Sequence, residues 1–447
     1  MRIFEKELKR LRAVDSLVNL NFTRFGVNKK QQIKRLLYEI SKREEISAGK
    51  IIKDLPFFDY PQIKRYLLER RYPHSSREPG ALKPYLPKIS LKACEFLSPK
   101  AEKYFPRRIF IERSARQASL SRRVKSLFKG ARIEEIASLK DYFCKHGRPK
   151  VEDYNKRRDT LFITDESYDF FKRCPCTKGA LSCGYNIFNL GFGCIFECTY
   201  CYLQDYSNSP GIILPANISG FFDRFGSYKK DGMRLGTGEF SDSLALDDIT
   251  QYSLPIIEFF REHMKATFEF KTKSTNINNL LCARHASNIV VSWSLNPQPL
   301  ADENEFYCAP VKERIEAAIS CVKAGYKVGF HFDPIIYSEG WQRQYSALID
   351  NLFSKIKPKH IAWISLGTFR FSPGLKQAIE RRFPENRILD EELLFGFDNK
   401  LRYPFSTRSD IYKHMVDLLA EYSLRSKIYL CMEEVSMWKE LKLKSPF

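Results

Sequence analysis

The sequence predicts an α/β fold built on a partial (β/α)6 barrel of the TIM type, preceded by a basic helical extension. Two observations support this prediction. Short apolar or β-branched runs alternate with amphipathic stretches through the second half of the chain, as in βαβ units with a parallel sheet, and a cysteine-rich loop follows the first run. The six runs expected to be strands are 186–190, 233–235, 267–270, 289–294, 327–332 and 361–366. Segments 311–324 and 341–356 between them are expected to be helices.

Residues 1–80 are expected to form a basic helical N-terminal extension. Apolar side chains recur every three or four positions from Ile33 to Ile40 in a field of Lys and Arg, which predicts an amphipathic helix. A further helix should begin near Pro61, because proline suits a first helical turn. The stretch 71–80 is rich in helix breakers and predicts a linker.

The cysteine loop has the spacing C-x₃-C-x₂-C, formed by Cys194, Cys198 and Cys201. Three thiolates this close can ligate three irons of a [4Fe–4S] cluster, because thiolate is the usual ligand of iron–sulfur clusters. The fourth iron then stays open to bind S-adenosylmethionine and pass it one electron, which is the radical-SAM arrangement. Zinc is the usual rival, but a zinc knuckle would need a fourth Cys or His at matching spacing, and none follows.

The expected strands end in polar residues, where a barrel of this kind places its chemistry. The second run is followed by a Gly-Thr-Gly-Glu stretch that contains Gly238, and glycine lets a backbone approach a ligand closely. Carboxylates at such ends can accept hydrogen bonds from an ammonium group, and a lysine can pair with a carboxylate. The amino-acid end of S-adenosylmethionine offers both groups.

The 447 residues carry 74 Lys+Arg against 53 Asp+Glu, a formal net charge of +21. This excess favours a polyanionic partner such as DNA, although a solvated basic face would have the same composition. A hydrophobic content of 43% is ample for a packed core. We expect a cytoplasmic protein with no membrane partner, because no apolar run has the length of a membrane span and no secretory h-region opens the chain.

From about residue 105 to residue 441, the chain resembles the spore photoproduct lyase family of radical-SAM proteins. Several motifs carry the resemblance in one order, which is more specific than the cysteines alone. They lie at 105–112, 183–185, 201–204, 292–297, 324–326, 365–371 and 429–433. The first hundred residues lie outside the resemblance.

The resemblance implies a radical-SAM partial barrel and a lyase that reverts the thymine dimer of spore DNA through a 5′-deoxyadenosyl radical. Cys194, Cys198 and Cys201 would ligate the cluster, and an electron donor such as flavodoxin or ferredoxin would reduce it. Tyr200 and Tyr202 match tyrosines thought to relay the radical. Contacts to S-adenosylmethionine are matched by Ser241, Asp242, Lys273 and Ser294. The expected domains are 1–80, a lyase-like N-terminal part at 81–180, the barrel at 181–385, and a C-terminal segment at 386–447 that packs on the barrel.

One position departs from the family. Authentic lyases place a hydrogen-donor cysteine three residues before the aspartate that Asp242 matches, and Glu239 stands there in this chain. A carboxylate cannot give a hydrogen atom to a carbon radical as a thiol can. The departure predicts a paralogue that keeps the radical generator and loses, or relocates, the quenching step.

Other functions stay open at this point. The enzyme could act on RNA, a peptide or a small molecule, or the protein could be a nucleic-acid-binding protein whose cluster is structural. Cys174, Cys176 and Cys183 precede the first strand and could bind a second metal.

Overall fold

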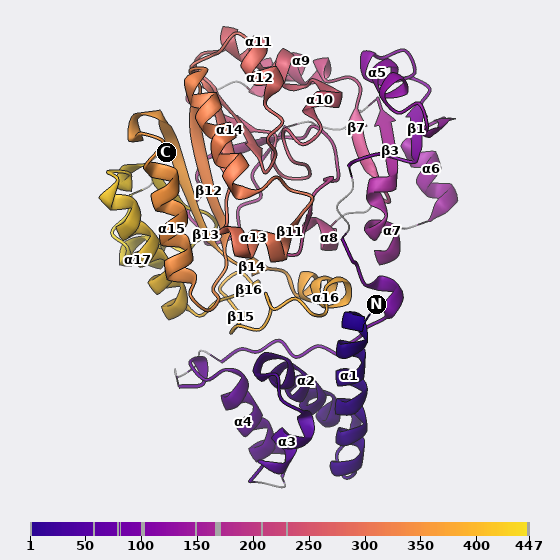
Figure 1. Cartoon of the computed structure of the whole chain (residues 1–447), viewed down its shortest axis with the longest axis vertical. Coiled ribbons are helices and arrows are strands. Elements are labelled where there is room, and N and C mark those ends of the chain that lie inside the picture. Colours follow the sequence, from indigo (N-terminus) through magenta and orange to yellow (C-terminus); the bar gives the residue numbers. More distant parts are fainter. Residues whose placement is uncertain are drawn as a thin grey trace. The chain divides into compact units, whose positions relative to one another are not determined.

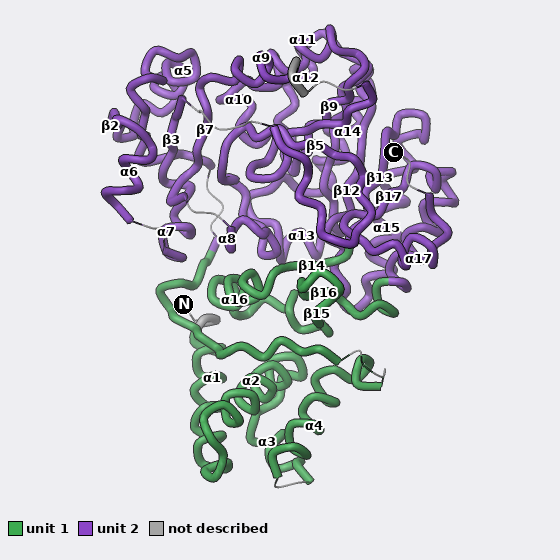
Figure 2. Tube along the Cα trace, turned by 180° about the vertical axis from the view of Figure 1, so that it is seen from behind, with its two compact units in different colours: residues 1–98, 368–408 green, residues 99–367, 409–447 purple. Residues whose placement is uncertain are grey.

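The computed structural model describes residues 2–56, 59–77, 80, 82–99, 103–147, 150–165, 171–206, 209–228 and 231–444. The chain divides into two compact units, coloured separately in Figure 2. Unit 1 comprises Met1–Ser98 and Thr368–Arg408, and unit 2 comprises Pro99–Gly367 and Ser409–Phe447. This division joins a late segment to the N-terminal region. The domain boundaries expected from the sequence are drawn on a different basis and stay a prediction.

Four helices open unit 1: α1 (Arg2–Asn21), α2 (Val27–Glu44), α3 (Ala48–Lys53) and α4 (Tyr60–Arg71). The helical extension is therefore confirmed as a local structure. The stripe expected between Ile33 and Ile40 is buried in the core of this helical group. Helix α4 contains Pro61 in its first turn and is capped by Asp59, whose carboxylate accepts a hydrogen bond of 2.8 Å from the Gln62 amide.

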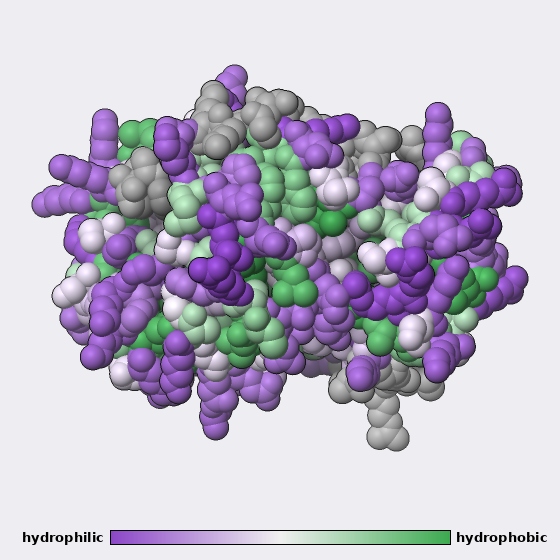
Figure 3. Space-filling view, turned by 90° about the horizontal axis from the view of Figure 1, so that it is seen from above, coloured by the Kyte–Doolittle hydropathy of each residue, from purple (hydrophilic) through white to green (hydrophobic). Residues whose placement is uncertain are grey.

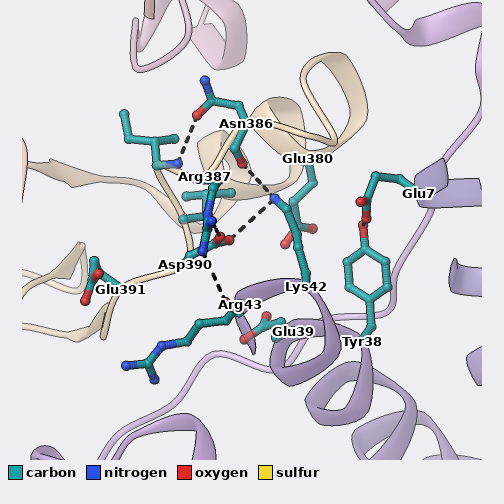
Figure 4. Close-up of polar contacts among 12 residues, drawn as sticks. Glu7, Tyr38, Glu39, Lys42, Arg43, Glu380, Asn386, Arg387, Asp390 and Glu391 are labelled. Atoms are coloured by element: carbon teal, nitrogen blue, oxygen red, sulfur yellow. Dashed lines mark hydrogen bonds and ion pairs between the residues drawn. The ribbon is translucent and has the colours of Figure 1, made fainter. Parts of the chain in front are cut away.

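The later part of unit 1 contains one helix and a small antiparallel sheet. Its elements are β14 (Arg370–Phe371), α16 (Pro373–Arg382), β15 (Leu394–Phe395) and β16 (Leu401–Arg402), with the strand order β14-β16-β15. It contacts α2 through charged side chains. In Figure 4, Lys42 points toward Asn386 and Asp390, and Arg387 reaches the Arg43 carbonyl at 3.1 Å.

The main sheet of unit 2 has the strand order β17-β13-β12-β10-β9-β8-β5-β4. Its strands are β4 (Phe171–Arg173), β5 (Tyr185–Phe188), β8 (Arg234–Gly236), β9 (Thr267–Thr272), β10 (Ile289–Ser294), β12 (Lys327–Ile335), β13 (Ile361–Thr368) and β17 (Ile428–Leu430). The strands from β5 to β13 are the six that the sequence predicted, and they lie side by side in sequence order. The partial barrel is therefore confirmed.

Helices separate these strands along the chain (Figure 1). They are α8 (Leu203–Tyr206), α9 (Ser219–Tyr228), α10 (Asp247–Thr250), α11 (Ser253–Glu262), α12 (Asn278–Cys282), α13 (Gln298–Asn304), α14 (Val311–Lys323), α15 (Trp341–Phe353) and α17 (Phe405–Glu421). Helix α18 (Val435–Glu440) follows the last strand. Helix α14 packs against β10 and β12. Helices α14 and α15 confirm the two that were expected from their amphipathic pattern.

A second, fully parallel sheet precedes the barrel in the chain and was not anticipated as a sheet of its own. Its order is β2-β1-β3-β7. The strands are β1 (Arg108–Glu112), β2 (Arg132–Ile136), β3 (Thr160–Thr164) and β7 (Ile212–Pro215), and the helices α5 (Ser119–Leu127), α6 (Leu139–His146) and α7 (Val151–Asn155) lie between the first three strands in sequence. Because β7 comes after the cysteine loop, this sheet spans both sides of the loop.

The face drawn in Figure 3 is largely hydrophilic, with smaller groups of hydrophobic residues between the polar ones. None of the helices in the described ranges combines the length and the apolar character needed to cross a membrane.

Candidate active site

The cysteine loop leaves the carboxyl end of β5, the first strand of the barrel. Gly193 precedes Cys194 with φ +89°, and a Cβ there would meet the Gly211 carbonyl oxygen at 3.2 Å, so glycine fits the turn. The loop then forms a short strand, β6 (Glu197–Cys198), which pairs antiparallel with β11 (Glu305–Phe306). This pairing fixes the middle cysteine in a backbone ladder at the mouth of the barrel.

Arg157 holds the same loop from the other side. Its guanidinium donates to the carbonyl oxygens of Cys194 at 3.1 Å and Phe196 at 2.6 Å, and to the Glu197 carboxylate at 2.6 Å. Both charged side chains are 2% exposed. A buried arginine whose nitrogens donate to several loop acceptors fixes a backbone conformation, because each lost contact would leave a buried polar atom without a partner.

Glu305, on the strand that pairs with β6, is the centre of a second charged group. Its buried carboxylate accepts hydrogen bonds from the Tyr200 hydroxyl, from Asn296 at 3.0 Å and from Arg314 at 2.6 Å, and Lys273 lies 3.6 Å away. Burial alone would raise the pKa of Glu305, but the attraction of Lys273 and Arg314 outweighs it and lowers the pKa to about 2. Glu305 is therefore a fixed negative charge beside the cysteine loop.

The three cysteines fit an iron–sulfur cluster by the chemistry of their donors. Burial raises the pKa of Cys201 to about 12, and the neighbouring Cys198 adds to the shift. Burial also raises the pKa of Cys194, and both other cysteines add to the shift. The three thiols therefore lie within electrostatic reach of one another. In the part of the chain that the structure describes, no three potential ligand side chains already converge closely enough to hold a metal ion. Cluster binding would therefore require the thiols to turn inward and lose their protons.

Ser241 and Asp242 lie beside Cys194, around a cavity of about 30 Å³. Asp242 organises the loop after β8, because its carboxylate accepts hydrogen bonds from the amides of Leu244, Ala245 and Lys273 at 2.8–3.0 Å. A fourth bond comes from the Thr272 hydroxyl at 2.6 Å. Burial raises the pKa of Asp242 despite these bonds. The structure thus brings three of the expected site residues together.

The other expected contacts to S-adenosylmethionine lie on neighbouring strand ends. Lys273 follows β9 and is already near the Glu305 carboxylate, and Ser294 ends β10 and is 5% exposed. Gly238 follows β8, where an added Cβ would meet only the Lys271 side chain at 3.8 Å, an ordinary contact. Steric crowding in this structure therefore does not require glycine at position 238.

The two tyrosines of the loop differ in their surroundings. Tyr200 is directed to the buried Glu305 carboxylate, and burial raises its pKa well above the usual value. Tyr202 is 42% exposed, and its hydroxyl donates to the backbone carbonyl of Glu239. The Glu239 carboxylate pairs with Lys172 of β4. Tyr202, Glu239 and Lys172 thus form one chain of contacts at the mouth.

The barrel interior below them is polar. Glu269 of β9 accepts hydrogen bonds from Ser292 at 2.5 Å, Trp363 at 2.7 Å and Arg234 at 3.3 Å, and it pairs with His331 at 2.8 Å. Gly236 of β8 makes room for this group. A Cβ at position 236 would lie 1.9 Å from the Tyr185 hydroxyl and 2.6 Å from the Glu269 carbonyl oxygen. These buried charged and polar groups therefore satisfy one another inside the barrel and hold its strands together.

Sequence reasoning missed the residues that support the loop. Arg157 lies in a run of basic residues that resembles a solvated surface, and Glu305 begins the two-residue strand β11 directly after α13, with no local sequence signal. The Cys308 thiol shares a hydrogen bond with Cys198, and nothing in the sequence around Cys308 indicates this contact. Their partners are distant in sequence, so no spacing pattern could identify them.

Comparisons with known proteins agree with this geometry. The model of the spore photoproduct lyase family matches residues 104–429. Spore photoproduct lyase of Bacillus subtilis (strain 168) is 27% identical over 336 residues, which span 73% of this chain and 94% of the relative. The lyase of Clostridium acetobutylicum is 24% identical over 293 residues, spanning 64% of this chain and 85% of that protein.

Solved structures support the fold. Spore photoproduct lyase complexed with dinucleoside spore photoproduct matches with a TM-score of 0.62 at 23% identity, covering 75% of this chain and 100% of that one. A variant of the lyase with bound AdoMet and dinucleoside spore photoproduct also matches with a TM-score of 0.62 at 23% identity, covering 74% of this chain and all of its own. Because the family model matches well over half of the chain, this protein belongs to the spore photoproduct lyase family of radical-SAM enzymes.

Proposed function

We propose that the protein binds a [4Fe–4S] cluster, cleaves S-adenosylmethionine reductively and acts on a DNA base or pyrimidine dimer. The observation that carries this proposal is the three-cysteine loop at the mouth of the barrel, held on one side by Arg157 and on the other by β11. The motif supplies three thiols and no fourth Cys or His, so a [4Fe–4S] cluster bound there would have one iron without a ligand from the motif.

Cys194, Cys198 and Cys201 would hold the cluster. S-adenosylmethionine would be bound by Gly238, Ser241, Asp242, Lys273 and Ser294. When bound, the cluster and S-adenosylmethionine supply a carbon-centred radical that can remove a hydrogen atom from a substrate. Arg314 forms the closer ion pair with Glu305, at 2.6 Å against 3.6 Å for Lys273. The Lys273 ammonium group can therefore also pair with the carboxylate of S-adenosylmethionine.

Three further residues would act around the radical. Tyr200 and Tyr202 flank Cys201 in the sequence and would relay a hydrogen atom beside the cluster. Glu239 would not itself donate a hydrogen atom. Its ion pair positions Lys172, whose ammonium group can meet a phosphate of the substrate.

DNA is the proposed substrate class because a related lyase was solved with dinucleoside spore photoproduct and because the net charge is +21. An electron donor such as flavodoxin or ferredoxin would reduce the cluster. We place the reaction in the cytoplasm, where such donors and reduced thiols are found.

The test is anaerobic reconstitution with iron and sulfide, followed by reduction in the presence of S-adenosylmethionine. We expect about four irons per chain and formation of 5′-deoxyadenosine, with more formed when irradiated DNA is added. The variant Cys198→Ala should lose both the iron and the nucleoside, whereas Cys282→Ala, at an exposed free cysteine, should behave as wild type. Stoichiometric zinc without iron would contradict the proposal.

A further inference from the structure

Cys174 lies at the edge of the barrel sheet, directly after β4. Its amide donates to the Tyr185 carbonyl at 2.9 Å, so the pairing of β4 with β5 extends to this residue. Side chains alternate between the two faces of a strand. Phe171 stacks on Phe221 of α9 with 4.9 Å between ring centroids, which places it on the helix-covered face. Lys172 and Cys174 are two residues apart, so their side chains lie on the same face of the strand, opposite to that of Phe171.

The shared face of β4 meets the mouth of the barrel. Lys172 pairs with the Glu239 carboxylate, and its ammonium lies 4.4 Å from the centre of the Phe240 ring. Cys174 lies within electrostatic reach of Glu239, and Tyr202 lies within reach of both Glu239 and Cys174. The Cys174 thiol, the Tyr202 phenol and the Glu239 carboxylate, from three separate parts of the chain, therefore lie within electrostatic reach of one another.

In this chain, the family's usual position for the hydrogen donor holds no thiol. Glu239 stands there, and its carboxylate pairs with Lys172. A carboxylate has no weak bond to hydrogen that a carbon radical could break. A thiol has one, provided that it keeps its proton. Burial raises the pKa of Cys174 to about 12, so its sulfur carries a hydrogen atom at neutral pH.

We propose that Cys174 is the hydrogen-atom donor that quenches the product radical, in place of the cysteine that Glu239 replaces. This assignment rests on the proposed function. The S–H bond of Cys174 breaks homolytically as a C–H bond forms on the substrate carbon, and a thiyl radical remains. The Tyr202 hydroxyl returns a hydrogen atom to the sulfur, and the phenoxyl radical takes up one electron from the flavodoxin- or ferredoxin-type donor and one proton from solvent. The hydrogen atom removed from the substrate stays in 5′-deoxyadenosine and the thiol hydrogen replaces it, so each turnover uses one S-adenosylmethionine, two electrons and one proton.

The other cysteines near the site are placed less well for this step. Cys308 shares a hydrogen bond with Cys198, a proposed cluster ligand, and lies beside the Glu305 group. Cys183 lies within electrostatic reach of Arg234 and Tyr429 as well as of Cys174, whereas Cys174 is also within reach of Glu239 and Tyr202. Cys176 follows a tight turn in which its amide donates to the Cys174 carbonyl at 2.7 Å. Cys176 therefore serves as a matched control, close in sequence and similar in exposure.

The first experiment asks whether Cys174 faces the substrate and requires no turnover. Holoenzyme is alkylated with N-ethylmaleimide, with and without dinucleoside spore photoproduct, and labelling is quantified by peptide mass spectrometry. We expect the ligand to slow labelling of Cys174 at least fivefold and to leave exposed Cys282 unchanged. Equal labelling rates of Cys174 with and without the ligand would overturn the assignment.

The second experiment follows the hydrogen atom. In D2O the thiol exchanges to S–D, so wild-type product should carry one deuterium from the enzyme. Cys174→Ser should lose this deuterium and at least nine-tenths of the product while still forming 5′-deoxyadenosine, and Cys176→Ser should match wild type. Deuterated product at the wild-type rate from Cys174→Ser would overturn the assignment, as would 5′-deoxyadenosine without deuterated product in wild type. Absence of 5′-deoxyadenosine would instead contradict the proposed function, and the labelling experiment would then decide the placement of Cys174.

Discussion

Arg157 shows how a residue outside the cysteine motif determines the shape of the motif. Its partners in the loop are two carbonyl oxygens and one carboxylate, and all lie within 3.1 Å. One carbonyl belongs to Cys194, a proposed cluster ligand, and the other to Phe196, two residues before Cys198. A change at Arg157 should therefore alter cluster binding without touching any sulfur.

We expect Arg157→Met to destabilise the fold by about 3–5 kcal/mol, because Glu197 would be left as a buried charge without its partner. Iron content after reconstitution should fall by more than half. Adding Glu197→Gln should recover part of the stability but little of the iron, since the carbonyls stay unsupported. Urea denaturation and iron assays measure the two effects. Arg132→Ala, at a side chain that is 77% exposed, is the control and should change stability by less than about 0.5 kcal/mol.

The low pKa of Glu305 predicts that the free energy of unfolding depends on pH in the acid range. Its folded-state pKa of about 2 lies below the usual value of 4.5, so its contribution is present above pH 4.5 and is lost as pH falls toward 2. The shift corresponds to about 3 kcal/mol. Glu305→Gln should be less stable than wild type at pH 7, and the difference should shrink between pH 4.5 and 2. Denaturation curves across this range test it, with the more exposed Glu134→Gln as control. A constant difference across the range would contradict the prediction.

At the scale of elements, the sequence predicted what periodicity and local motifs can encode. The strands from β5 to β13 are apolar runs because parallel strands in a barrel are covered on both faces, and α14 and α15 have clear amphipathic patterns. The sheet of β1, β2, β3 and β7 was missed. Strand β2 is largely exposed, which hides it from an apolar pattern, and β7 joins that sheet only after the chain has passed through the cysteine loop.

The candidate site also contains some residues that could be predicted from the sequence and others that could not. The cysteines and the strand-end residues could be found from spacing and from their place after each strand. Arg157, Glu305 and Lys172 could not, because each acquires its role from a partner on a different element. The contact between Arg157 and Glu197 joins residues 40 positions apart. Such pairings depend on tertiary packing, to which a single sequence gives no direct signal.

Helix α2 and helix α16 should respond together to a change in one buried residue. Glu39 lies 2.8 Å from both Arg71 and Lys376, and it is 9% exposed. We expect Glu39→Gln to cost about 3–5 kcal/mol, because several buried cations lose their counter-charge. Amide exchange should rise in both α2 and α16. Glu69→Gln, in an exposed i,i+4 pair with Arg65, should cost less than about 0.5 kcal/mol. Faster exchange in α2 alone would contradict the coupling.

At the scale of the whole molecule, the helical extension carries both buried charges in ion pairs and exposed cations on its surface. Its interior pairs join it to the segment 368–408 within unit 1, as with Arg35 and Glu380 at 2.6 Å. Deleting residues 1–80 would therefore remove partners of buried charges as well as any surface used for binding. A loss of DNA binding after such a deletion could not be assigned to the surface, so exposed cations are the better target.

Three exposed cations of the extension suit this purpose: Arg24, Lys29 and Lys53. Arg24 and Lys29 lie over the rings of Phe25 and Tyr60 at 5.4 and 5.1 Å, so a basic and aromatic surface is present. If it contacts phosphates, Arg24→Glu/Lys29→Glu/Lys53→Glu should weaken binding of duplex DNA and flatten the slope of log K against log salt by up to about 3. Fluorescence anisotropy at several salt concentrations measures both.

The matched control carries the same change of net charge in unit 2, as Lys355→Glu/Lys357→Glu/Lys359→Glu, where all three lysines are exposed. A surface contact predicts a large loss for the first triple variant and a small one for the second, because condensed counterions are released only where phosphates are contacted. Equal losses would mean that the net charge of +21 acts through long-range attraction alone. The helical extension would then be a packed appendage of unit 1, and recognition of DNA would depend on the barrel mouth.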